Sequence, residues 1–245
     1  MSKEITPIAH RGASSYAPEN TFAAFDLAVE MGIGEIELDV HFNKDSQIIV
    51  IHDETLDRTT NSTGPVCDRT LEEIQSLDAG SWFDEKFSGE KVHTLDEVFD
   101  RYKNQLRFHI EIQSKEAEGL ASRTCELVKA YGLEDRTTIT SFWKQWLMES
   151  RSYAPEIPTG WLVPLGYETP WDDSVIEEAL QEGFTQICPR TSAVSPALVQ
   201  TLHDHGFSVR CWGVYNEELM LKAVESGADA MTLNFPDKLK NHLLT

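Results

Sequence analysis

The sequence predicts an α/β fold, a (β/α)8 TIM barrel with a small insertion after the second strand. Short β-rich apolar runs alternate with longer helical patterns along the chain, which is typical of parallel βαβ units. Eight such runs in 245 residues match the size of a (β/α)8 barrel. A doubly wound open sheet is the alternative, but its GxGxxG fingerprint is absent.

The barrel strands are expected where buried β-forming residues cluster, and the helices where apolar residues recur at helical spacing. The expected barrel strands are Pro7–Gly12, Glu35–Val40, Arg107–Gln113, Thr137–Phe142, Pro158–Val163, Gln186–Arg190, Ser208–Val214 and Ala230–Asn234. The expected helices are Thr21–Met31, Glu116–Tyr131, Asp172–Gln181, Ser195–His205 and Glu217–Glu225.

Local signals at the helix ends support these boundaries. Ser195 followed by Pro196 is typical of an N-cap with proline at the first helical position. Four glycines each follow a helical pattern and fit the left-handed position that ends a helix. They are Gly132, Gly183, Gly206 and Gly227.

One region interrupts the alternation. Gln47–Asp53 is expected to be a short extra strand, and the long segment Glu54–Lys91 is expected to be irregular. A loop of this length is usually functional or an inserted subdomain. We therefore expect one domain over residues 1–245, with 54–91 as a small insertion within it.

Charge and composition exclude several classes of function. Twenty-one basic and 41 acidic residues give a net charge of −20, which repels phosphate backbones and anionic membranes and argues against nucleic-acid binding and stable membrane insertion. The N-terminus lacks the apolar core of a secretory signal. Four isolated cysteines without zinc-ligand spacing suit a reducing compartment, so we expect a cytoplasmic protein. The oligomeric state stays open.

Carboxylates occupy strand positions where apolar residues are expected. Glu37 and Asp39 are two residues apart and therefore face the same side of their strand. If Glu111 on the next barrel strand faces the same point, the three carboxylates need a cation to offset their repulsion. Oxygen ligands favour Mg²⁺ or Ca²⁺. The alternative is that these carboxylates lie at a solvated strand edge or in structural ion pairs.

Two histidines and an arginine complete the candidate site. His10 and His52 stand at predicted strand ends, where an imidazole suits acid–base chemistry near neutral pH. Arg11 offers a planar fork for phosphate oxygens. Together with a cation, these groups are the parts needed to cleave a phosphodiester. The alternative is that either histidine has only a structural role.

At these residues the chain resembles the glycerophosphodiester phosphodiesterase family. Four motifs carry the resemblance, mainly in the first half of the chain: His-Arg-Gly, Pro-Glu-Asn-Thr, Glu-x-Asp and His-Asp-x-x-x-x-Arg-Thr-Thr. The resemblance implies a TIM barrel that hydrolyses glycerophosphodiesters to glycerol 3-phosphate and an alcohol.

The resemblance also implies roles for individual residues. Glu37, Asp39 and Glu111 would hold a divalent metal, His10 and His52 would be the acid–base pair, and Arg11 would contact the phosphate. Glu19 and Asn20 would cap the first helix and orient the site. Trp212 and Gln113 would join Arg11 in binding substrate.

The chain departs from the family pattern at three strands. Gln113 stands where the family usually has a lysine near the phosphate, and Asn234 where it usually has aspartate. The usual Trp-Thr-Val-Asn is replaced by Trp212-Gly213-Val214-Tyr215. A neutral amide at 113 predicts weaker phosphate binding than an ammonium ion would give.

Two other functions remain open from the sequence. A lysophospholipase D would need the same chemistry plus an apolar groove, which Trp82, Phe83 and Phe87 of the insertion could line. These aromatic residues more often simply pack an insertion. A catalytically weakened phosphodiester-binding protein is the second alternative, supported only by Gln113 and Asn234.

Overall fold

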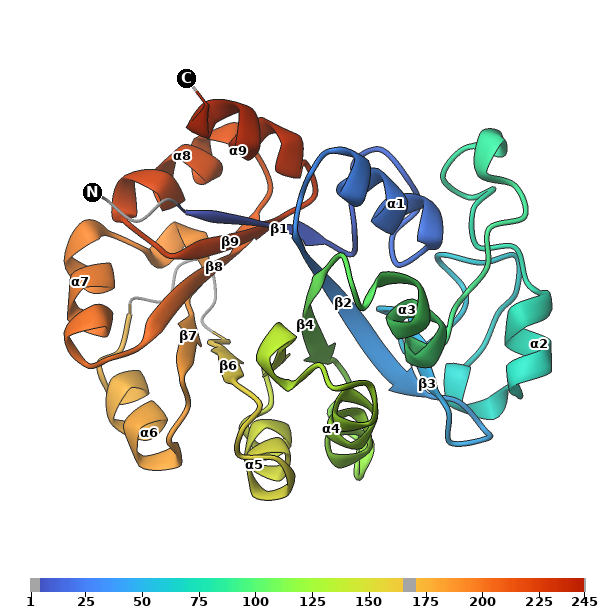
Figure 1. The fold of residues 1–245 in the computed structure, drawn as a ribbon, viewed down its shortest axis with the longest axis horizontal. Coiled ribbons are helices and arrows are strands. Elements are labelled where there is room, and N and C mark those ends of the chain that lie inside the picture. Colours follow the sequence, from blue (N-terminus) through green and yellow to red (C-terminus); the bar gives the residue numbers. More distant parts are fainter. Residues whose placement is uncertain (1–4, 165–170, 245) are drawn as a thin grey trace.

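The chain folds as a closed parallel barrel surrounded by helices in the computed structural model, which describes residues 5–164 and 171–244 (Figure 1). The barrel order is β1-β9-β8-β7-β6-β5-β4-β2, and β1 pairs with β2 to close it. Every neighbouring pair in this ring is parallel. The predicted (β/α)8 barrel is confirmed within the described residues.

Most of the observed strand ends lie within two residues of the ends predicted from the sequence. The strands are β1 (Thr6–His10), β2 (Glu35–Phe42), β3 (Ile48–Val50), β4 (Arg107–Ile112), β5 (Thr137–Ser141), β6 (Thr159–Leu162), β7 (Gln186–Cys188), β8 (Ser208–Val214) and β9 (Ala230–Leu233). The extra strand β3 pairs antiparallel with β2 and lies outside the ring, as the insertion after the second barrel strand requires.

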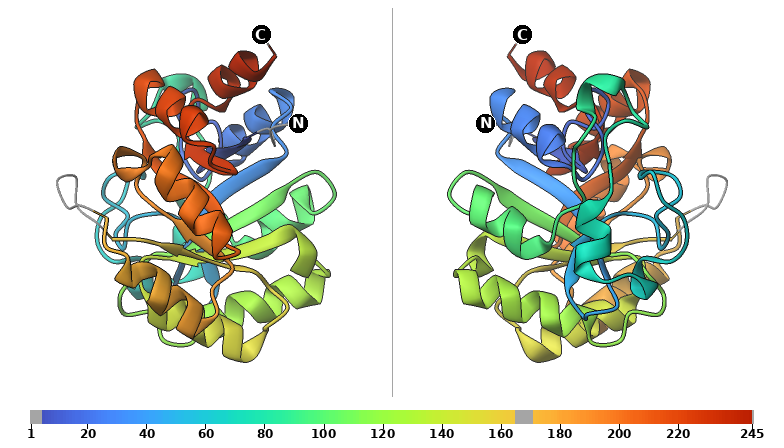
Figure 2. Two further views of the ribbon diagram at one scale, coloured as in Figure 1. Left: turned by 90° about the vertical axis from the view of Figure 1, so that its left-hand side faces the viewer. Right: turned by 90° about the vertical axis from the view of Figure 1, so that its right-hand side faces the viewer.

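Helices follow the strands and cover the outside of the barrel (Figure 2). They are α1 (Phe22–Glu30), α2 (Leu71–Ser76), α3 (Leu95–Tyr102), α4 (Leu120–Tyr131), α5 (Lys144–Tyr153), α6 (Ser174–Glu182), α7 (Pro196–Asp204), α8 (Glu217–Ser226) and α9 (Pro236–Leu243). Single 3-10 turns lie at η1 (Val66–Asp68), η2 (Glu85–Phe87), η3 (Glu134–Arg136) and η4 (Thr191–Ala193). None of the described helices is long and apolar enough to span a membrane.

The helix-end signals hold with one exception. Ser195 caps α7 through its side chain, and Gly132, Gly183 and Gly227 are left-handed C-caps. The helix predicted from Glu116 instead begins at Leu120. Its N-cap is Gly119, whose φ of 80° cannot continue a right-handed helix.

The segment 54–91 is less irregular than the sequence suggested. It contains α2, which begins with a reciprocal capping box between Thr70 and Glu73. A small apolar cluster beside the main core includes Leu56, Val66 and Ile74. The insertion therefore has its own packing, at the right of Figure 1 beside β3.

Candidate active site

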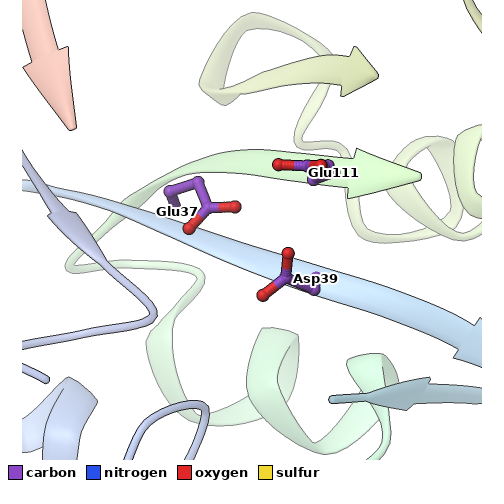
Figure 3. A group of neighbouring side chains, drawn as sticks. All are labelled: Glu37, Asp39 and Glu111. Atoms are coloured by element: carbon purple, nitrogen blue, oxygen red, sulfur yellow. The ribbon is translucent and has the colours of Figure 1, made fainter. Parts of the chain in front are cut away.

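Three buried carboxylates meet inside the barrel. Asp39 on β2 pairs in register with Glu111 on β4, and Glu37 faces the same side of β2 two residues earlier (Figure 3). One oxygen from each carboxylate lies within 4.8 Å of the others. Glu37, Asp39 and Glu111 are 2%, 1% and 8% exposed. The sequence prediction that these side chains converge on one point agrees with this geometry.

The donor set fits a divalent cation. One oxygen of each carboxylate, Glu37 Oε1, Asp39 Oδ1 and Glu111 Oε1, is buried without a hydrogen-bond partner among the described residues. Burial and the adjacent Asp39 raise the pKa of Glu111 to about 8, and burial also raises the pKa of Glu37. Buried anionic oxygens without partners are costly unless a cation coordinates them. Hard oxygen donors suit Mg²⁺ or Ca²⁺.

Arg11 lies beside this group at the end of β1. Its Nε is 3.2 Å from Asp39 Oδ2, and its Nη1 donates to Glu19 Oε1 at 2.8 Å. Its φ of 56° lies in the left-handed region, which costs a non-glycine residue about 1–3 kcal/mol. The following Gly12 has a φ of 82°, and a Cβ there would lie 2.7 Å from the backbone of Ala24. The turn thus needs glycine beside the strained arginine.

Glu19 and Asn20 support the site, but the prediction that they cap the first helix is wrong. The N-cap of α1 is Thr21, whose side chain accepts from Ala24 N. Asn20 has a φ of 58°, and its amide donates to Asp39 Oδ2 at 3.0 Å, so it orients a carboxylate of the buried group. Glu19 bonds to arginines instead of to helix backbone groups.

Arg58 lies beside this site but is not among the residues predicted for it. Its guanidinium bonds to Asp53 at 2.7 and 2.9 Å and to Glu19 at 2.7 and 2.9 Å. Because Glu19 also bonds to Arg11, ion pairs connect Arg58 of the insertion to Arg11, the residue expected to contact the phosphate. The sequence feature that could have identified Arg58 is its place as the arginine of the His-Asp-x-x-x-x-Arg-Thr-Thr motif.

His10 is oriented by a neutral partner. Its Nδ1 lies 2.6 Å from Asn234 Oδ1, and its Nε2 lies 3.8 Å from Glu37 Oε2. Because a carbonyl oxygen only accepts, Nδ1 carries the proton and Nε2 is left as the basic nitrogen. Burial and the charge of Arg11 lower the pKa of His10 to about 4. His10 is therefore neutral at neutral pH.

His52 is oriented by a charged partner. Its Nδ1 lies 2.6 Å from Asp53 Oδ1, and its Nε2 lies 2.9 Å from Gln113 Nε2. Asp53 is held in turn by Arg58, and the Arg58 and His52 hydrogen bonds keep the pKa of Asp53 well below its usual range. The structure thus places Gln113 against a histidine, a contact that the sequence did not predict.

These groups share one cavity of about 240 Å³. Its polar wall includes Arg11, both histidines and Gln113, and its apolar side includes Phe142 and Trp212. The Trp212 ring meets Phe142 edge-on at 5.0 Å, and the Arg190 guanidinium lies 4.9 Å from the indole centroid. Trp212, which the family resemblance assigns to substrate binding, lines this cavity.

The aromatic residues of the insertion pack on one another. Phe83 contacts Trp82 and Phe87 edge-on, each at 5.7 Å between ring centroids. None of the three lines the cavity that holds the histidines. The packing interpretation of these residues therefore fits better than an acyl-chain groove.

Comparison with known proteins places this site in a family. The model described as the glycerophosphoryl diester phosphodiesterase family matches residues 10–238. A glycerophosphodiester phosphodiesterase of Caldanaerobacter subterraneus is 39% identical over 96% of each chain. A glycerophosphodiester phosphodiesterase of Agrobacterium tumefaciens has a crystal structure that is 30% identical, with a TM-score of 0.81 over 97% of this chain and 99% of that chain.

A second solved structure carries a ligand. An Oleispira antarctica phosphodiesterase in complex with its product sn-glycerol-3-phosphate is 28% identical, with a TM-score of 0.87. The match covers 98% of this chain and 97% of that chain. The similarity in sequence and fold therefore extends across nearly the whole chain.

Proposed function

This chain belongs to the glycerophosphoryl diester phosphodiesterase family, and we propose that it cleaves glycerophosphodiesters to glycerol 3-phosphate and an alcohol by two-histidine, cation-dependent catalysis. It is a phosphoric diester hydrolase. The observation that carries the finer proposal is that one cavity is lined by Glu37, Glu111, both histidines and Arg11, with Asp39 grouped with the two glutamates.

Glu37, Asp39 and Glu111 would hold the divalent cation. When bound, Mg²⁺ or Ca²⁺ supplies positive charge that neutralises phosphate oxygens and favours attack on phosphorus. Asn20 fixes Asp39 through its amide and so keeps one ligand oriented. Arg11 is already held between Asp39 and Glu19, which presents its guanidinium to a phosphate in the cavity.

We assign one proton transfer to each histidine because the two rings have different hydrogen-bond partners. His10 Nε2 accepts the proton of the attacking oxygen, since Asn234 leaves that nitrogen basic. His52 donates a proton from Nε2 to the leaving alkoxide; its Nδ1 is held by Asp53, and the Gln113 amide must then present Oε1, not Nε2, to the protonated ring nitrogen. A bond forms between the attacking oxygen and phosphorus, and the bond from phosphorus to the alcohol oxygen breaks.

Trp212 and Gln113 would complete substrate binding. The indole and the ring of Phe142 contribute apolar surface to the cavity. This arrangement suits a small diester with one charged and one carbon-rich surface. Four free cysteines, three of them buried, support a reducing compartment, and we propose the cytoplasm.

Replacing Gln113 with lysine should raise kcat/KM for glycerophosphocholine by about tenfold. A hydrogen bond to a charged group contributes about 1.5–3 kcal/mol and a neutral one about 1 kcal/mol, and about 1.4 kcal/mol corresponds to one decade. Steady-state kinetics at saturating cation measure this change, with Gln113→Met as the control that removes all donors. A drop in kcat/KM in the folded lysine variant would show that the amide contact with His52 matters more than charge.

A coupled glycerol 3-phosphate assay over a panel of diesters, with and without EDTA, tests the proposed function. Release of glycerol 3-phosphate from short-headgroup diesters that EDTA abolishes is the expected result. Turnover only of lysophospholipids would indicate a lysophospholipase D. Tight binding of the diesters without turnover would indicate a catalytically weakened binding protein.

A further inference from the structure

The backbone of Arg58 is held by the insertion, while its side chain reaches the edge of the catalytic site. Leu56, two residues earlier, is fully buried in the small apolar cluster, and its amide donates to Gly64 O at 3.0 Å. Thr60, two residues later, donates through its hydroxyl to Leu56 O at 2.7 Å. The backbone is therefore anchored on both sides of Arg58, although the side chain is 43% exposed.

The guanidinium of Arg58 holds two carboxylates from different parts of the chain. Its Nε and Nη2 donate to the two oxygens of Asp53 at 2.7 and 2.9 Å. Its Nη1 and Nη2 donate to the two oxygens of Glu19 at 2.7 and 2.9 Å. A single exposed ion pair contributes little, but a planar fork that bonds to both oxygens of each partner fixes the orientation of both carboxylates.

Each of these carboxylates also bonds to a side chain that lines the catalytic cavity. Asp53 Oδ1 accepts from His52 Nδ1 at 2.6 Å, and Glu19 Oε1 accepts from Arg11 Nη1 at 2.8 Å. These are the same two oxygens to which Arg58 Nη2 donates. One nitrogen atom of Arg58 is therefore linked through a single oxygen to each of the two cavity residues.

Arg58 stands behind the cavity and not in its wall. The cavity is lined by His52 and Arg11, but not by Arg58, Asp53 or Glu19. The hydrogen bonds to the two carboxylates use four of the five N–H donors of the guanidinium. These contacts indicate that Arg58 acts on its neighbours and does not itself bind the substrate phosphate.

We propose that Arg58 is a positioning residue that couples two groups of the mechanism: through Asp53 it orients the His52 ring, and through Glu19 it orients the Arg11 guanidinium. This assignment rests on the roles that the proposed function gives to those two cavity residues. His52 has to point Nε2 at the leaving oxygen, and Arg11 has to present its fork to the phosphate. Because one guanidinium orients both, the insertion aligns the general acid with the phosphate-binding group.

Kinetics of Arg58→Met on two substrates test the coupling, because methionine keeps an unbranched side chain but cannot bond to either carboxylate. For glycerophosphocholine, kcat should fall by at least about tenfold and KM should rise, since a shift of about 1 Å in a catalytic group can cost about 10²-fold. The p-nitrophenyl diester of glycerol 3-phosphate has a leaving group that needs no proton. On this substrate kcat should recover toward that of the unaltered chain, while KM stays raised. Equal losses of kcat on both substrates would show a general loss of structure and would overturn the proposal.

Two further variants separate the two connections. Asp53→Asn should lower kcat for glycerophosphocholine with little change in KM, whereas Glu19→Gln should chiefly raise KM. Adding either change to Arg58→Met should cost less than the two single effects combined, because residues of one network are not additive. The same kinetic pattern in Asp53→Asn and Glu19→Gln, or full additivity of both with Arg58→Met, would overturn the coupling.

Arg101→Met is the matched control. Arg101 also bonds through two nitrogens to one carboxylate, that of Asp26, at 3.2 and 2.6 Å, and its side chain is 48% exposed. Neither Arg101 nor Asp26 lines the cavity, so this variant should leave kcat and KM unchanged for both substrates. Unchanged kinetics in a folded Arg58→Met as well would show that the ion pairs of Arg58 are only structural and would overturn the proposal.

If Arg58→Met does not fold, Arg58→Lys decides. Its ammonium group keeps the positive charge but cannot bond to both oxygens of both carboxylates, so the same substrate-dependent loss of kcat is expected. Full activity of Arg58→Lys would show that charge alone suffices and would overturn the coupling. Full turnover of glycerophosphocholine by His52→Ala would instead overturn the proposed function, and this inference with it. If His52→Ala loses turnover and the Arg58 variants do not, only this inference fails.

Discussion

Replacing His52 with alanine should lower kcat for glycerophosphocholine by about 10²–10⁴-fold, the usual contribution of a general acid or base. His52 lines the cavity but is partly exposed, and its contacts are with Asp53 and Gln113, so its loss should change the melting temperature little. Replacing His10 should have a kinetic effect of the same size. His203→Ala is the control, because His203 bonds to Asp229 and does not line the cavity.

The leaving group distinguishes the two histidines. A p-nitrophenyl diester of glycerol 3-phosphate releases a phenolate that needs no proton. We therefore expect His52→Ala to lose most of its defect on this substrate, and His10→Ala to keep its defect. Near-full turnover of glycerophosphocholine by His52→Ala would contradict its role, and rescue of His10→Ala in place of His52→Ala would reverse the assignment.

Saturating Mg²⁺ or Ca²⁺ should raise the melting temperature of the metal-free chain by roughly 5–10 °C. A cation at a hundred times its Kd stabilises a fold by about 2.7 kcal/mol, and 1 kcal/mol shifts the melting temperature by about 2–4 °C in a chain of this size. Calorimetry in EDTA and in each cation measures the rise. Activity should follow the same dependence.

Glu37→Gln should remove most of that rise, because it deletes one of the three ligand charges. Glu35→Gln is the matched control: Glu35 lies on the same strand, but it is not one of the three grouped carboxylates and pairs with His109 at 2.8 Å. Glu35→Gln should keep the cation-dependent rise even if it lowers the melting temperature itself. A melting curve that neither EDTA nor either cation alters would contradict the cation site.

The barrel was predictable because its signals are local. Buried parallel strands are largely apolar runs, and glycine caps mark where α4, α6 and α8 stop. Helices α2, α3, α5 and α9 are absent from the predicted ranges. Two of these, α2 and α3, begin with capping boxes at Thr70 and Thr94, so a readable signal was present.

The part of the site that lies on a single strand could be predicted from the sequence. The two-residue period of a strand places Glu37 and Asp39 on one face. The register that sets Asp39 opposite Glu111 comes from pairing between distant strands and is not written in either segment. The contact between Arg58 and Glu19 likewise could not be read from either local segment, because the two residues are 39 positions apart in the sequence.

Hydrolysis of glycerophosphocholine in ¹⁸O-labelled water, with Mg²⁺ present, tests the account most directly, because it identifies the bond that breaks. The account predicts that glycerol 3-phosphate carries one ¹⁸O on phosphorus and that the released choline carries none. Label in the choline, or release of glycerol and phosphocholine instead, would contradict it.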